Sequence, residues 1–167
     1  WYSSKEDAIR NSIHNGHAYV DLGLPSGLLW AACNVGANSP EDYGDYFAWG
    51  ETQPKAHYNL ETYKWCEGGY TKYCISSSWG TVDNKTILEL SDDAANANWG
   101  GLWRMPTGEE NNELRSECTW TATTKNGVNV YKVTSKTNGN SIFLPAAGYR
   151  NGSNLYSVGE GGYYWSS

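Results

Sequence analysis

The sequence is poor in several side chains that commonly fill a protein core or cover a long helix. Its 167 residues include only two Phe and one Met, and 18 % are charged. So few charges argue against long amphipathic helices, whereas nineteen Gly favour short strands and irregular loops. We therefore expect one domain, long enough to bury a real core, in which loops connect short elements.

Cationic clusters and long hydrophobic runs are also absent. The net charge of −6 argues against a nucleic-acid partner, because phosphate contacts require a basic patch. No run approaches the ~18 apolar residues that a membrane-spanning helix requires, so we expect no membrane insertion.

Cysteine and histidine show no metal-binding spacing. There is no Cys-x-x-Cys, and the three His are scattered, so the sequence predicts no metal and no cofactor. Cys66 and Cys74 lie close together in a Gly/Tyr-rich loop, and we predict a bridge between them if the domain is extracellular. Cys33 and Cys118 stand in apolar contexts, where we expect burial.

What the sequence does contain is nine Trp and thirteen Tyr. Both side chains combine a large apolar area with a hydrogen-bonding group, and they recur in binding surfaces. They also fill the cores of loop-rich folds. At this point either role is open for each of them.

The region from Trp99 to Leu114 has the strongest local signals. Thr107 followed three residues later by Glu110 forms a capping box, and Pro106 prevents an earlier helix from continuing. A helix of about ten residues should follow, with Leu114 and Cys118 on one face. We expect Arg104 to hold the preceding turn through carboxylates or backbone carbonyls.

Elsewhere the patterns predict a mixture of short helices and antiparallel strands. Asn-Gly at 126–127 lies between two β-rich runs and is the clearest hairpin signal. A long irregular loop is expected over residues 50–83, either functional or pinned by its own side chains. The remaining predictions are an N-terminal helix or linker (1–16), a hairpin (17–24 and 28–33), short helices beginning at Ser39 and Ser91, strands at 119–124, 128–134 and 141–144, and a candidate strand at 163–165.

Four segments in order resemble one family. They are YVDLGLPSGLLWAACNVGA (19–37), PEDYGDYFAWGE (40–51), ANWGGLWRMPTGEE (97–110) and SIFLPAAGYRNGS…GGYYWSS (141–167). These segments resemble gut-bacterial surface domains of the C-type-lectin-like superfamily related to formylglycine-generating enzymes, including the major paralogous domain proteins. The last segment is also similar to the variable region of target proteins of diversity-generating retroelements. The resemblance covers about residues 17–167.

This resemblance implies an α+β, C-type-lectin-like fold with two helices, a small twisted antiparallel sheet and long irregular loops. It implies a non-catalytic domain at the cell surface or outside the cell, which binds a protein or glycan through the segment after the Gly-Tyr-Arg turn. Gly148, Tyr149, Gly159, Gly161 and Trp165 would be framework. The implied ligand-binding residues are Arg150, Asn151, Ser153, Asn154, Leu155, Tyr156, Ser157, Glu160 and Tyr163, with Leu155, Tyr156 and Tyr163 as anchors.

The sequence departs from the family in three ways. Family members continue past Trp-Ser-Ser into a further variable stretch and a closing strand, so we expect either a truncated domain or a sheet completed by another chain or terminus. The paired cysteines of formylglycine-generating enzymes have no counterpart, and neither have the calcium-and-sugar tripeptides of true C-type lectins. Two alternatives to ligand binding stay open, namely a structural or assembly domain of a surface or pilus-tip protein and an oxidase of the formylglycine-generating type.

Overall fold

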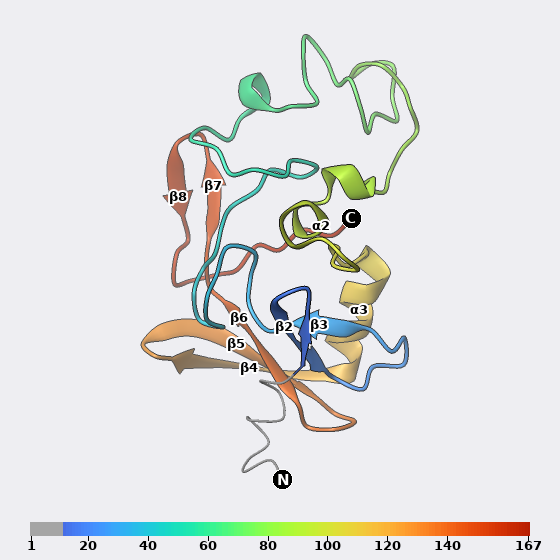
Figure 1. The fold of residues 1–167 in the computed structure, drawn as a ribbon. Coiled ribbons are helices and arrows are strands. Elements are labelled where there is room, and N and C mark those ends of the chain that lie inside the picture. The colour runs from blue at the N-terminus through green and yellow to red at the C-terminus, as the bar shows by residue number, and fades with distance from the viewer. Residues whose placement is uncertain (1–11) are drawn as a thin grey trace.

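A computed structural model describes residues 12–167. In this range the chain has an α+β fold with two α-helices and small antiparallel sheets, joined by long irregular segments (Figure 1). The first sheet has the order β1-β2-β3, formed by Ile13–His14, His17–Asp21 and Leu29–Ala31. The predicted hairpin is confirmed, with its turn closed by a hydrogen bond from the Gly27 N–H to the Leu24 carbonyl (2.9 Å).

The N-terminal helix prediction is only partly within the described range. Residues 1–11 lie outside it, and at Ile13 and His14 the chain forms strand β1, which pairs with β2. The prediction of a helix or linker over residues 1–16 is therefore wrong for a helix at these two positions. Asn15 and Gly16, both with positive φ (48° and 83°), make the tight turn that returns the chain to β2.

The second sheet has the order β4-β5-β6, formed by Cys118–Lys125, Val128–Ser135 and Ser141–Pro145. Asn126 and Gly127 both adopt positive φ (49° and 82°), as a two-residue turn between twisted strands requires. The hairpin predicted around them is confirmed. A second turn, at Asn138-Gly139, leads into β6.

Helix α3 (Gly108–Glu117) confirms the predicted capping box. The Thr107 hydroxyl accepts from the Glu110 N–H at 3.2 Å, and the Glu110 carboxylate accepts from the Thr107 N–H at 2.8 Å. The Arg104 guanidinium donates to both Glu110 oxygens (2.8 and 2.6 Å) and to the Met105 carbonyl (3.0 Å). The start of α3 is thus fixed by one connected polar group, as the spacing predicted.

The other two predicted helix starts need correction. The helix at 91–98 is divided into a 3₁₀ turn, η2 (Leu90–Asp92), and α2 (Ala94–Trp99), and its cap is Asp93, not Ser91. Asp93 accepts from the Asn96 N–H at 3.0 Å. At Ser39 the chain makes only a turn, in which the Asp42 carboxylate accepts from the Ser39 N–H (3.0 Å). That carboxylate satisfies the local N–H groups without a helix.

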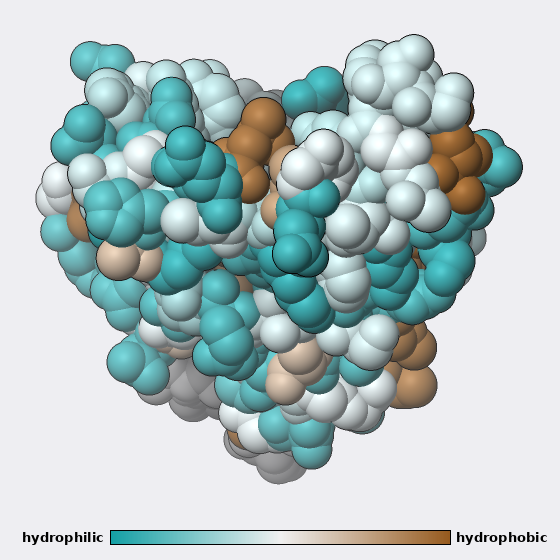
Figure 2. Space-filling model, turned by 90° about the horizontal axis from the view of Figure 1, so that it is seen from above, coloured by the Kyte–Doolittle hydropathy of each residue, from teal (hydrophilic) through white to brown (hydrophobic). Residues whose placement is uncertain are grey.

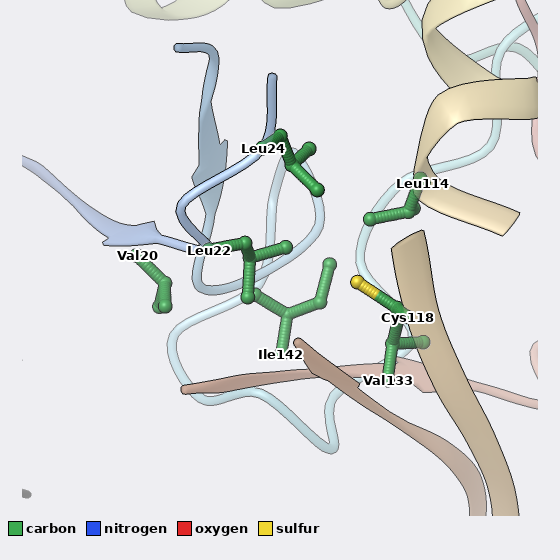
Figure 3. Packing of buried hydrophobic residues seen from close by; sticks show 7 residues of the cluster. All are labelled: Val20, Leu22, Leu24, Leu114, Cys118, Val133 and Ile142. Carbon is green, nitrogen blue, oxygen red and sulfur yellow. The ribbon is translucent and has the colours of Figure 1, made fainter. Parts of the chain in front are cut away.

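The main core joins the two sheets and α3. Leu22, which is fully buried, packs with Ile142 and Val133 from the second sheet and with Leu114 and Cys118 from the α3–β4 junction (Figure 3). Val20 and Leu24 complete this cluster from the β2–β3 hairpin side. Leu114 and Cys118 are both buried in this core, but the prediction that they share a helix face is wrong, because α3 ends at Glu117 and Cys118 is the first residue of β4.

Residues 50–92 form an irregular lobe beyond α2, in green in Figure 1. Its helical elements are the 3₁₀ turn η1 (Leu60–Thr62), capped by Asn59, and η2 at its end. Buried Asp92 accepts from the Lys72 ammonium (2.5 Å) and the Tyr73 hydroxyl (2.7 Å), which joins this lobe to the start of α2. The lobe is therefore held by its own side chains, one of the two alternatives that its length predicted.

No helix within residues 12–167 has the length and apolar character to cross a membrane.

Candidate functional site: a tyrosine surface on the β7–β8 hairpin

The candidate site begins where β6 ends at Pro145. After Ala146 and Ala147 the chain turns at Gly148 (φ 68°) into a hairpin made of β7 (Tyr149–Asn151) and β8 (Asn154–Tyr156). A Cβ at position 148 would overlap the Tyr156 carbonyl oxygen, so the turn requires glycine. Gly152 (φ 58°) opens the two-residue connection at the tip.

Two tyrosines of this hairpin and Tyr163 of the chain that follows it form one exposed aromatic cluster, which we call the tyrosine surface. Tyr149 is paired directly with Tyr156 across the strands, with ring centroids 5.6 Å apart. Tyr163 packs edge-on against Tyr149 at 4.8 Å. Exposed fractions are 38 % for Tyr149, 43 % for Tyr156 and 62 % for Tyr163. The rings therefore present apolar area to solvent while they support one another.

Tyr149 is the member of this cluster for which the resemblance implied a framework role instead. The resemblance gave Tyr156 and Tyr163 as anchors, and the structure brings them together through Tyr149. A signal was present in the sequence. A two-residue turn at Gly152-Ser153 places Tyr149 opposite Tyr156, because pairing in such a hairpin is fixed by the turn.

The predicted site residues do not share one face. Neighbouring side chains on a strand point to opposite sides, so Arg150 and its cross-strand partner Leu155 lie on the side away from Tyr149 and Tyr156. The Arg150 guanidinium lies over the Tyr46 ring (5.2 Å). Leu155 therefore does not join Tyr156 and Tyr163 in a single patch, contrary to the expectation that all three act as anchors together.

The polar residues predicted for the site surround the tip and the returning chain. The side chains of Asn151, Ser153, Asn154 and Glu160 are exposed, and Ser157 is half-buried. Asn151 and Asn154 are a cross-strand pair on the tyrosine side of the hairpin. The Asn154 amide also donates to the Tyr156 hydroxyl at 3.3 Å. The tyrosine surface thus has hydrogen-bonding groups at its edge.

The return from Ser157 to Tyr163 is tied to the body of the domain. The Gly148 N–H donates to the Gly161 carbonyl (2.7 Å), and the Gly159 N–H donates to the Ala146 carbonyl (2.8 Å). The Asn129 amide donates to the Gly159 carbonyl at 2.8 Å. The glycines at 159 and 161 therefore form a fixed backbone platform under the exposed side chains.

The candidate strand at 163–165 is not formed. Side chains hold this segment instead. The Tyr164 hydroxyl donates to the Pro145 carbonyl (2.8 Å), and the Trp165 indole donates to the Phe47 carbonyl (2.9 Å). The Trp49 indole in turn donates to the Ser166 carbonyl (2.8 Å). Trp165 is 54 % exposed, so its framework role depends on this hydrogen bond more than on burial.

The irregular lobe contacts the hairpin at its tip. Tyr58 and Gly152 exchange backbone hydrogen bonds of 2.8 and 2.9 Å. Figure 2 looks onto the end of the molecule that carries the lobe and the hairpin, and the surface there is mostly hydrophilic, with separate hydrophobic patches. Exposed apolar side chains of the lobe include Ile75 (58 %) and Trp79 (60 %).

The cysteines are all free in residues 12–167, including Cys66 and Cys74, so the predicted bridge is not formed. The Cys74 thiol donates instead to the Ser76 carbonyl (3.1 Å). Cys118 is buried as predicted, and burial raises the pKa of its thiol. Cys33 is only half-buried. Its burial raises the pKa of its thiol, and the negative charge of the nearby Asp42 raises it further. Both thiols are therefore weak nucleophiles at neutral pH.

Among residues 12–167 there is no group of three or more His, Cys, Asp or Glu side chains that could hold a metal ion. Comparison of the chain with protein-family models, with curated proteins and with solved structures gave no match.

Proposed function

We propose that this chain is a non-catalytic ligand-binding domain with a C-type-lectin-like fold, displayed at the cell surface or outside the cell. The tyrosine surface (Tyr149, Tyr156 and Tyr163), with the polar residues at its edge, binds the ligand. The observation that carries this proposal is that Tyr156 of the hairpin and Tyr163 of the returning chain both contact Tyr149, and that all three rings are exposed.

The physical support is a difference in packing between this hairpin and the core. The core is closed by Leu22, Val133 and Ile142, each at most 2 % exposed, and none of the three tyrosines belongs to it. Tyrosine rings offer a large contact area at a low entropic cost because they have only two rotatable side-chain bonds. Such residues commonly supply most of the binding free energy of an interface.

The backbone beneath the tyrosines supports the same proposal. Position 148 requires glycine, because its φ is positive and any Cβ there would overlap the Tyr156 carbonyl oxygen. The Gly148 N–H donates to the Gly161 carbonyl. A surface on such a platform loses little conformational entropy when a ligand binds. This arrangement fits a domain that keeps its fold while its exposed side chains change.

The ligand class follows from shape and chemistry. The rings of the tyrosine surface are exposed, and they are flanked by amide, hydroxyl and carboxylate side chains at Asn151, Asn154, Ser157 and Glu160. An exposed aromatic surface with adaptable polar groups suits a protein epitope or a glycan.

One observation favours a structural or assembly role as the second candidate. The Tyr164 hydroxyl and the Trp165 indole, next to the tyrosine surface, donate to the backbone carbonyls of Pro145 and Phe47 and hold the chain there. Gly/Tyr-rich segments can therefore be packing elements in this domain. For the third alternative, an oxidase of the formylglycine-generating type, the raised pKa values of Cys33 and Cys118 are unfavourable.

The proposed function is tested by screening the purified chain on a glycan array and on a displayed library of extracellular protein domains. The matched variants are Tyr156→Ala together with Tyr163→Ala, and Tyr131→Ala, an exposed tyrosine (49 %) on β5 outside the hairpin. We expect a saturable hit that the double variant weakens by at least ~10-fold and that Tyr131→Ala retains, since one hot-spot tyrosine contributes ~1–3 kcal/mol. A hit that both variants retain would place binding elsewhere, and no hit in either format would favour the structural role.

A further inference from the structure

The chain contains four Asn-Gly pairs, at residues 15–16, 126–127, 138–139 and 151–152. An Asn that precedes Gly is chemically labile, because the next backbone nitrogen can attack the side-chain amide and glycine has no Cβ to obstruct the attack. All four pairs share this sequence, so the surrounding structure decides which of them reacts in the folded chain.

The side-chain amides of the first three pairs are held by groups that lie far away in the sequence. Their acceptors are the Trp99 carbonyl for Asn15, the Glu41 carboxylate for Asn126 and the Asp21 carbonyl for Asn138. The amide carbon must rotate toward the following backbone nitrogen before the two can react. A hydrogen bond that fixes the amide therefore slows the reaction at these three sites.

Asn151, the fourth of these residues, is not held in this way. Its side chain is exposed at the end of β7 and makes no hydrogen bond within residues 12–167. Its cross-strand partner Asn154 donates its own amide to the Tyr156 hydroxyl instead. The amide carbon of Asn151 is thus free to rotate toward the Gly152 nitrogen.

The nitrogen of Gly152, by contrast, is held by the irregular lobe. The Gly152 N–H donates to the Tyr58 carbonyl (2.9 Å), and the Tyr58 N–H donates to the Gly152 carbonyl (2.8 Å). The Tyr58 hydroxyl is fixed in turn, because it donates to the Tyr46 carbonyl (2.6 Å) and accepts from the Lys55 N–H (3.1 Å). A backbone nitrogen attacks only after its proton has left, so the reaction requires a local opening that separates Gly152 from the lobe.

We propose that Asn151-Gly152 is a self-modification site, at which the side chain of Asn151 loses ammonia whenever the lobe releases Gly152. The Gly152 nitrogen gives its proton to water and forms a bond to Asn151 Cγ. The bond from Cγ to the side-chain nitrogen breaks, and that nitrogen takes a proton from solvent and leaves as ammonia. Water then opens the cyclic imide to aspartate or isoaspartate, and either product carries a carboxylate that is ionised at neutral pH.

The two products change the tyrosine surface in different ways. Aspartate adds a negative charge on the side of the hairpin that carries Tyr149 and Tyr156. Isoaspartate also lengthens the main chain directly before the turn at Gly152, and that turn sets Tyr149 opposite Tyr156. Both products should therefore weaken ligand binding, a consequence that rests on the proposed function, whereas the chemical step does not.

Peptide mapping by mass spectrometry tests the chemical step. The full chain is incubated in mildly alkaline buffer with and without urea, and each Asn-Gly site is followed by a mass gain of about 1 Da. In urea the four sites should react at similar rates. In the folded chain Asn151 should react at least ~10-fold faster than the other three, because only its amide is free and local opening at a loop contact is frequent.

Two variants separate the gate from the reactive pair. Tyr58→Phe removes the hydroxyl bonds to Tyr46 and Lys55, so it should speed the reaction at Asn151 by ~3–10-fold and leave Asn126, the internal control, unchanged. Gly152→Ala places a methyl group beside the attacking nitrogen, at a position with open space around it, and should slow the reaction at Asn151 by at least ~10-fold.

Three results would overturn the proposal. Asn151 reacting no faster than the other three sites in the folded chain would show that its free amide is not decisive. The same ranking of the four sites in urea would show that sequence neighbours set the rates. An unchanged rate in Tyr58→Phe would show that the lobe contact is not the gate. None of these measurements uses a ligand, so the glycan and protein-domain screens test the tyrosine surface independently.

Discussion

Neighbouring side chains at the β7–β8 hairpin have different roles: some are exposed to solvent, and others contact the rest of the domain. Tyr149 and Tyr156 are placed opposite each other and exposed, whereas Arg150, the next residue, points to the other side and covers Tyr46. Tyr164, only one residue past Tyr163, uses its hydroxyl to hold the Pro145 carbonyl. Residue type alone therefore does not identify the binding residues, and the strand register and the turn at Gly152 decide which tyrosines face solvent.

Thr107 gives the simplest prediction for a single residue. Replacing it with alanine removes the hydroxyl that accepts from the Glu110 N–H, so Thr107→Ala should lower the free energy of unfolding by ~1 kcal/mol. Thr107→Ser keeps the acceptor and should stay close to the parent. Urea denaturation of the three proteins checks this, and equal loss in both variants would show that the methyl group matters and not the cap.

Tyr164 predicts a specific loss of stability at alkaline pH. Although 43 % of the residue is exposed, its hydroxyl is enclosed between Asn34 and Pro145, and burial of this end raises its pKa from 10.0 to about 12. Between pH 10 and 12 the unfolded chain releases this proton while the folded chain keeps it, so stability should fall as the pH rises through that window.

The control for the alkaline experiment is Tyr164→Phe. It should lose about 1 kcal/mol at neutral pH, for the missing hydrogen bond to Pro145, and show a shallower decline above pH 10. Burial also raises the pKa of Tyr63 to about 12, so Tyr63 contributes part of the alkaline loss of stability in both proteins. Denaturation midpoints measured across the pH range give the comparison. Identical slopes would mean that Tyr164 ionises normally in the folded state.

At the scale of elements, side-chain networks replace regular secondary structure over residues 50–92. The Asp92 carboxylate, in a residue only 3 % exposed, accepts from Lys64, Lys72 and Tyr73, and Glu89 accepts from Lys72 and Lys85. Although burial alone would raise it, the bonds from Lys72 and Tyr73 lower the pKa of Asp92. This lobe therefore depends on a few charged residues.

Asp92→Ala should destabilise the lobe strongly. It removes the buried carboxylate that pairs with Lys72, and breaking such a pair costs about 3 kcal/mol. Hydrogen exchange should then increase over residues 58–90 before it increases in β4 and β5. Lys85→Ala, which removes only an exposed pair with Glu89, serves as the control and should change little. Uniform destabilisation of the whole chain by Asp92→Ala would contradict a separately held lobe.

Gly148 provides the matching prediction for the hairpin. An alanine Cβ there would meet the Tyr156 carbonyl at a backbone φ of 68°, so Gly148→Ala should distort the hairpin. Gly152→Ala has a similar φ of 58° but open space around it, and should cost only about 1–2 kcal/mol. Thermal melting of the two variants compares these effects. A smaller loss for Gly148→Ala than for Gly152→Ala would contradict the fixed turn.

For the whole molecule, the sequence predicted the elements that depend on local signals. The capping box at Thr107 and the Asn126-Gly127 hairpin follow from contacts a few residues apart, and both are confirmed. The resemblance predicted an α+β chain with two helices and small antiparallel sheets, which residues 12–167 show. Its C-type-lectin-like identity and ligand-binding function stay predictions.

What the sequence could not predict depends on long-range partners. The cap of α2 moved from Ser91 to Asp93, whose other carboxylate oxygen accepts from the Met105 N–H, a residue twelve positions away. No helix begins at Ser39, because the Asp42 carboxylate accepts from the Ser39 N–H within a local turn. Tyr149 was missed as a site residue because its exposure depends on the pairing of β7 with β8. In each case a tertiary or cross-strand contact decided the outcome.

The central claim is that the tyrosine surface is exposed for binding and does not hold the fold together. Comparing the melting temperature of the variant carrying Tyr156→Ala and Tyr163→Ala with that of Leu22→Ala tests it most directly. Leu22 is fully buried, so its replacement should cost ~2–5 kcal/mol. The double variant removes two ring–ring contacts of ~0.5–1.5 kcal/mol each, so its loss should stay below that of Leu22→Ala and within ~1–3 kcal/mol. A decrease as large as that of Leu22→Ala would show that these tyrosines are packing residues and would contradict the claim.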